Sequence, residues 1–173
     1  MKTSKAICAL LVCLAIGGSL GGQDKPPLQE TLTWMKNFLG QHGFMMVNNK
    51  LVQTTNIVKI ESCTITVEHV FGNAGTPKDT KRRTESVMLG DLDPNSVHLE
   101  TNKYSGSQVF LMIAERSDSS PKIEVEFEKG DGSKEKLWVA QESLVIDSNE
   151  NAQRFGTAFT HAITLCGGKP APF

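Results

Sequence analysis

The sequence has little of what marks several large classes of protein. Its 18 lysine and arginine residues are matched by 19 aspartate and glutamate residues, so the chain has no basic excess. Because nucleic acids are bound by positive surfaces, we expect no nucleic-acid partner. The apolar run at residues 6–16 is too short to cross a bilayer, and we expect no membrane span.

Short catalytic and cofactor motifs are also missing. The chain has no Gly-x-Ser-x-Gly nucleophile motif and no glycine-rich phosphate loop. Its histidines do not pair at a metal-ligand spacing on one helix, and they are scattered at His42, His69, His98 and His161. We therefore expect no cofactor and no metal. An enzyme would need a site assembled from residues that are distant in the sequence.

The N-terminus has the features of a secretory signal peptide. Lys2 and Lys5 precede the apolar run, and Ser19 and Gly21 occupy the −3 and −1 positions of a cleavage site after residue 21. Removing residues 1–21 takes two lysines away and changes the formal charge from −1 to −3. We expect a periplasmic or extracellular protein, and a polar, disordered lead over residues 22–27.

Of the four cysteines, two would leave with the signal peptide. The remaining pair, Cys63 and Cys166, lie on the apolar faces of their predicted elements. Exported chains are oxidised, so we expect one disulfide between these two residues. Two buried thiols are the alternative.

Two amphipathic helices are predicted at the ends of the mature chain. The first spans residues 28–43, and its apolar side is typical of packing on a core rather than on a membrane. The second begins after Asp147 or Ser148 and ends at Gly167 and Gly168. Its apolar residues recur at helical spacing: Ala152, Phe155, Phe159, Ala162, Ile163 and Cys166.

Between these helices, apolar and polar residues alternate as they do in β-strands. Cys63, Ile65, Val67 and Phe71 share one parity, which predicts a strand with one buried face. Val58 and Ile60 have the opposite parity, so we expect a bulge or break near residues 61–62. Short strands with hairpin turns predict a mainly β, α+β domain over residues 44–173. We expect an antiparallel roll or barrel of about seven strands closed by the C-terminal helix.

The order of these elements resembles a PH-like roll, in which a C-terminal helix plugs one open end of a bent sheet. The C-terminal residues are also similar to the Ala-x-Arg-Phe…Ala-Phe-x-His-Ala ending of uncharacterised exported bacterial proteins. In this chain the ending comprises Ala152, Arg154, Phe155, Ala158, Phe159, His161 and Ala162. The first resemblance implies a fold and the second implies export, and neither implies an activity.

One basic cluster is the candidate ligand site, at Lys78, Lys81, Arg82 and Arg83 in a polar loop over residues 72–83. It could bind an anion or an acidic partner. It could also be a solvated loop whose charges keep a strand edge from aggregating. The acidic balance of the mature chain favours the second interpretation.

These patterns favour a non-catalytic binding or interaction module, with a peptide added to a strand edge as one mode of binding. Two alternatives stay open. A carrier would hold a small apolar ligand in an internal cavity of the roll. An enzyme would show a cleft with two or more close titratable groups whose pKa values are shifted.

Overall fold

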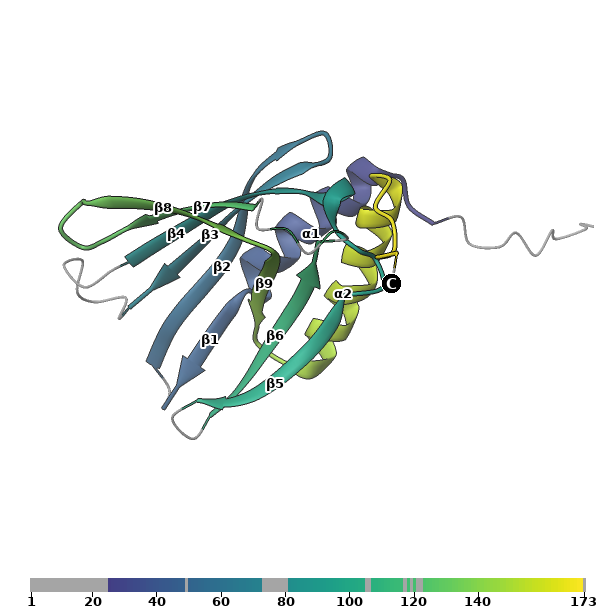
Figure 1. Cartoon of the computed structure of the whole chain (residues 1–173). Coiled ribbons are helices and arrows are strands. Elements are labelled where there is room, and N and C mark those ends of the chain that lie inside the picture. Colours follow the sequence, from purple (N-terminus) through teal and green to yellow (C-terminus); the bar gives the residue numbers. More distant parts are fainter. Residues whose placement is uncertain are drawn as a thin grey trace, which may run out of the picture.

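The computed structural model describes residues 25–48, 50–72, 81–104, 107–116, 118, 120 and 123–172. Within these residues, nine strands form two antiparallel sheets and two α-helices pack beside them (Figure 1). The predicted signal peptide lies outside the described residues, as does Lys78. Of the predicted disordered lead, residues 25–27 are described, and the carbonyl oxygen of Pro26 accepts a hydrogen bond from His161 Nε2 at 2.9 Å.

The larger sheet has six strands in the order β1-β2-β3-β4-β7-β8. Hairpin turns join most of its neighbours, so nearly every pairing is local in sequence and antiparallel. Its strands are β1 Phe44–Val47, β2 Lys50–Glu61, β3 Thr64–Phe71, β4 Lys81–Met88, β7 Ile123–Glu128 and β8 Lys134–Val139.

The smaller sheet has three strands in the order β5-β6-β9. They are β5 His98–Tyr104, β6 Ser107–Glu115 and β9 Gln141–Ile146, and a 3-10 turn at Leu89–Asp91 follows β4. The chain passes from the larger sheet to the smaller one between β8 and β9 (Figure 1). Ala140 lies at this bend, and its carbonyl oxygen accepts the backbone N–H of Arg116 at 2.9 Å.

Both helices form where the sequence predicts them. Helix α1, Leu28–His42, packs against β2, and helix α2, Asn149–Leu165, packs against β5 and β6. The hydroxyl of Ser148 caps α2 by accepting the backbone N–H of Asn151. The helices also pack against each other, with Phe38 of α1 6.0 Å from Phe155 of α2 between ring centroids.

Apolar side chains from both sheets and both helices form one core. Its largest buried members include Leu32, Met35, Ile65, Phe155 and Phe159. The disulfide is confirmed: Cys63, just before β3, bonds Cys166, just after α2, across 103 residues of chain. The bond ties the end of α2 to the start of β3. No helix among the described residues is long and apolar enough to cross a membrane.

The structure confirms a mainly antiparallel α+β fold but not a closed barrel. The larger sheet ends at β1 and β8, and the smaller one ends at β5 and β9, because the chain changes sheets at Ala140. The described strands number nine rather than about seven. The residues of β1 and β9 gave only short apolar runs in the sequence, yet both pair along their length with a neighbouring strand.

The predicted break near residues 61–62 is confirmed: β2 ends at Glu61, the chain turns at Ser62 with a φ of 52°, and β3 begins at Thr64. A bulge also lies within β2 at Val58, where the pairing with β3 shifts and the side chain is 45% exposed. One local prediction needs correction. The predicted polar loop over residues 72–83 does not extend to Arg83, because β4 begins at Lys81, so three members of the predicted loop cluster belong to a strand.

Candidate functional site

One face of the larger sheet changes from apolar to polar along its strands. Strand register places Ile57, Val67, Glu85 and Val125 side by side across β2, β3, β4 and β7. The next row on the same face lies two residues farther along each strand. It consists of Thr55, His69, Arg83 and Phe127. The apolar end of this face lies in the core, and the polar end leads away from it.

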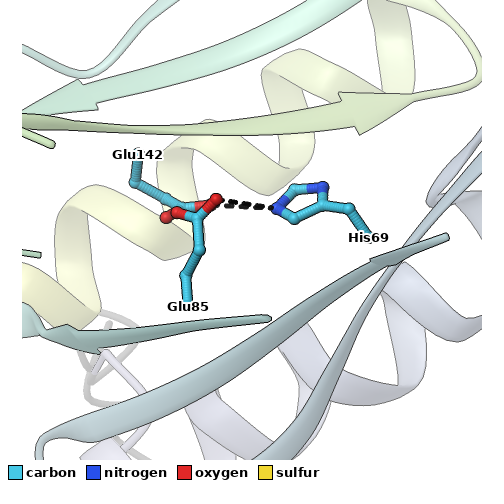
Figure 2. A group of neighbouring side chains, drawn as sticks. All are labelled: His69, Glu85 and Glu142. Carbon is cyan, nitrogen blue, oxygen red and sulfur yellow. Dashed lines mark ion pairs between the residues drawn. The ribbon is translucent and has the colours of Figure 1, made fainter. Parts of the chain in front are cut away.

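Three ionisable side chains meet at this polar end. His69 comes from β3, Glu85 from β4 and Glu142 from β9 of the other sheet, so the cluster bridges the two sheets (Figure 2). Their exposed fractions are 1%, 0% and 0%. His69 Nε2 lies 3.5 Å from Glu85 Oε1 and 3.5 Å from Glu142 Oε1. One candidate ligand atom from each residue lies within 4.8 Å of the other two.

The other side of the His69 ring is held by polar neighbours on β2. Thr55 Oγ1 lies 3.0 Å from His69 Nδ1, and Gln53 Nε2 lies 3.5 Å from the same nitrogen. When Nδ1 donates its proton to Thr55 Oγ1, Nε2 turns an unprotonated lone pair toward the two carboxyl groups. Among the described residues, His69 Nε2 has no hydrogen-bond partner, whereas the carboxyl groups of Glu85 and Glu142 interact with each other and Glu85 also pairs with Arg83.

Burial sets the protonation of this cluster. Burial lowers the pKa of His69 to about 4, although the charge of Glu85 opposes the shift, so the imidazole is neutral at pH 7. Burial and the neighbouring Glu142 raise the pKa of Glu85 to about 9, against the effect of Arg83. Burial likewise raises the pKa of Glu142. Two close carboxyl groups with raised pKa values meet one part of the criterion stated above for an enzyme; the other part is a cleft that holds them.

Arg83 connects the cluster to solvent. Its Nε forms an ion pair with Glu85 Oε1, and its side chain is 20% exposed while that of Glu85 is 0% exposed. Its guanidinium lies over the ring of Phe127, with 5.8 Å from Cζ to the ring centroid. The cluster is therefore approached along the polar end of the sheet face.

Of the other described members of the basic cluster, Lys81 shares the sheet face of Arg83, opposite Phe71, and Arg82 does not. Lys81 and Arg82 are exposed, and Arg82 forms an ion pair at 2.8 Å with Glu68 on β3. Because side chains alternate along a strand, Arg82 projects from the opposite face of the sheet to Arg83. The predicted patch is thus divided between two faces, and Lys78 lies outside the described residues.

The buried carboxyl groups can be neutralised in two ways, by protons or by a cation. A proton shared with His69 needs a hydrogen bond, and 3.5 Å is too long for a good one. A tetrahedral Zn²⁺ ion has ligands at about 2.0–2.1 Å, which places two ligand atoms about 3.4 Å apart. The spacing of the His69 nitrogen and the carboxyl oxygens therefore fits an ion shared by all three groups better than a proton shared with His69. The two carboxyl groups can instead share a proton with each other.

A second ionisable group joins the two helices. Asp147 accepts hydrogen bonds at 2.8 Å from both Asn151 Nδ2 and His42 Nδ1. Although burial acts to raise it, these bonds hold the pKa of Asp147 below its usual range. The contact fixes the end of α1 to the start of α2, which is a structural role.

The predicted binding modes lie away from the cluster. A surface groove of about 1180 Å³ lies between α1, α2 and β5, and no residue of the cluster lines it. The β8 edge available for strand addition carries Lys134 and Lys136, which pair with glutamates on β7. Charged edge strands resist the addition of another strand.

A weak signal for this cluster is present in the sequence. His69 has the parity of Val67, and Glu142 has the parity of Leu144, so each places a polar group on an apolar strand face. Glu85 similarly shares its face with Val87. In the sequence alone, His69 is one of four scattered histidines and Glu85 is a charged residue close to the basic cluster.

Comparisons with known proteins identify no relative. The chain matches no family model, no curated protein and no solved structure. The function is therefore argued from the site itself.

Proposed function

We propose that this protein is an exported metal-binding module that holds one Zn²⁺ ion between its two sheets. The ligands are His69 Nε2 and one carboxylate oxygen each from Glu85 and Glu142. The observation that carries the proposal is the position of His69 Nε2, which is buried and 3.5 Å from an oxygen of both carboxyl groups. Neutral imidazole and carboxylate are ligands that zinc accepts.

The surroundings of the three residues support a metal ion. Ligating histidines usually donate their second ring N–H to a neighbour, and Thr55 Oγ1 at 3.0 Å from Nδ1 is such a neighbour. The ion pair between Arg83 and Glu85 orients one carboxylate in the same way. The three ligands come from strands of two sheets, and the disulfide holds the start of β3 in place. These features keep the site formed before an ion arrives.

Export is the second part of the proposal. The Cys63–Cys166 disulfide is compatible with an oxidising compartment outside the cytoplasm, and the N-terminal sequence pattern supports the same location. An exported metal-binding protein meets its ion without the thiol-rich buffers of the cytoplasm.

The test is a zinc titration of the mature, disulfide-bonded protein after treatment with a chelator. We expect one ion per chain, with release of protons because Glu85 must be deprotonated to bind. Glu142→Gln and His69→Leu should each weaken zinc binding by about 100-fold or more, since each removes one of three ligands.

The matched control is His98→Leu. His98 Nε2 lies 3.6 Å from Glu100 Oε1, nearly the same distance, but both side chains are about half exposed. We expect this variant to bind zinc as the parent does. Zinc binding that is absent in the parent, or equal in the parent and Glu142→Gln, would show that protons rather than a metal neutralise the cluster.

A further inference from the structure

The proposed zinc site has a ligand position left for something other than protein, and the inference here rests on that proposed function. Three side chains supply three ligand atoms, whereas zinc takes four. Structural zinc sites usually fill all four positions with side chains, and sites that keep one open bind water or a substrate there. Among the described residues, the cluster offers three groups.

The charges around the open position favour an anion. The carboxylates of Glu85 and Glu142 neutralise a divalent ion, and a histidine that binds a metal through a ring nitrogen is neutral and adds no charge. Arg83 then adds one positive charge beside Glu85, where its side chain is only 20% exposed. A partly buried positive charge next to a metal ion is stabilised by a negatively charged ligand. A carboxylate is such a ligand, since it can bind the ion and the guanidinium fork together.

The approach to this position is lined by aromatic rings. Phe71 lies outward of His69 on the same face of β3, with the two rings stacked at 6.3 Å between centroids. Phe127 lies beside Arg83 across the β4–β7 pairing. Both phenylalanines are half-buried. Half-buried rings next to an anion site suit a ligand whose charged group has an apolar body attached.

We propose that the protein binds a small organic acid, whose carboxylate occupies the fourth zinc position and pairs with Arg83. The apolar body of the acid lies against Phe71 and Phe127. This assigns Arg83 a binding role that differs from the basic patch expected from the sequence, because Arg82 lies on the opposite face and Lys81, on the same face, is exposed.

The test uses the protein loaded with Co²⁺, whose visible absorption reports the ligands of the metal. At saturating Co²⁺ the parent is titrated with benzoate, acetate and inorganic phosphate. We expect a saturable spectral change with benzoate, and about tenfold weaker binding of acetate, which lacks the ring. Arg83→Met should weaken benzoate binding more than tenfold, and Phe127→Ala should bring benzoate close to acetate.

Arg82→Met is the matched control, since Arg82 precedes Arg83 but pairs with Glu68 on the opposite face. It should bind benzoate as the parent does. A Co²⁺ spectrum that no anion changes would overturn the organic-acid site and leave the metal site standing. Tighter binding of phosphate than of benzoate would also overturn the organic-acid site. Failure of Co²⁺ to bind at all would instead contradict the proposed function.

Discussion

The two ends of one sheet face are equally buried but differ in chemistry. At the closed end, next to the disulfide, Ile65 and Val87 are 0% exposed and pack against the helices. At the open end, Thr55 is 0% exposed and His69 is 1% exposed, with Arg83 leading outward. Burial of apolar groups stabilises the fold, whereas burial of ionisable groups costs free energy unless they are paired.

The proposed binding role of the open end accounts for this difference. A fold of two antiparallel sheets could place leucine or valine at these positions and enlarge its apolar core. Buried ionic groups replaced by apolar ones of similar volume often leave a protein as stable as before, or more so. Functional sites are where a fold commonly retains such costly groups. The predictions below test whether the two ends differ as stated.

The largest effect should come from truncating the core at the closed end. Phe159 is 0% exposed, and Phe159→Ala should lower the free energy of unfolding by about 3–5 kcal/mol. Phe127 is a matched residue at the open end but is only half-buried, so Phe127→Ala should cost about 1–2 kcal/mol. Urea unfolding followed by circular dichroism gives both values. Equal losses would show that the open end belongs to the same core.

The disulfide should be the next largest contribution. Cys63→Ala with Cys166→Ala removes a bond that spans 103 residues, and native disulfides of small exported domains contribute about 2–5 kcal/mol. The loss arises because the unfolded chain is no longer constrained. Zinc affinity of the folded variant should stay within a few-fold of the parent, because the bond lies at the opposite end of β3 from His69. A large loss of zinc binding in the folded variant would contradict this separation of the two ends.

Replacing the polar cluster should change stability in the opposite sense. The variant His69→Leu, Arg83→Met, Glu85→Met and Glu142→Met exchanges four polar groups for apolar ones of similar size. We expect its free energy of unfolding to equal that of the metal-free parent or to exceed it by about 1–4 kcal/mol. It should bind no zinc. Denaturant unfolding curves of the variant and the metal-free parent, measured in parallel, give the difference in stability. A strongly destabilised variant would show that the cluster is a structural network.

The closed end was more predictable from the sequence than the open end, for a physical reason. Helical spacing of Phe155 and Phe159 marks α2 directly, since a helix is built from local contacts. The Cys63–Cys166 bond was predicted because two cysteines remain in a chain that the N-terminal pattern predicts to be exported. Alternation in β3 likewise marked its buried face.

The open end depends on contacts between residues that are far apart in the sequence. His69 and Glu85 meet because β3 pairs with β4, and Glu142 reaches them because the chain crosses between sheets at Ala140. A polar residue on an apolar strand face is visible in the sequence, but the residues that it will meet are not. Arg83 was assigned to a loop because a run of basic residues is typical of loops. Its place in a strand follows only from the pairing of β4 with β3.

The last predicted effect is a pH dependence confined to the open end. In the folded protein the pKa of Glu85 is raised to about 9, so its protonated form favours folding. This contribution is complete below the ordinary value of 4.5 and is lost as the pH rises toward 9. The pKa of His69 is lowered to about 4, so its protonation affects stability only below the ordinary value of 6.5. Between pH 6.5 and 9, the metal-free protein should therefore lose stability as the pH rises, by at most about 1 kcal/mol per pH unit.

Urea unfolding in the presence of a chelator, at intervals over this pH range, measures the slope. The double variant Glu85→Gln with Glu142→Gln keeps the shapes of both side chains but cannot ionise at either, so its stability should be nearly flat over the range. Glu126→Gln is the matched control, because Glu126 lies on the solvent face of β7 and pairs with Lys134 at 2.7 Å. It should keep the slope of the parent. A parent that is itself flat would mean that Glu85 is already ionised in the folded state, and the two ends of the face would then differ less than their chemistry indicates.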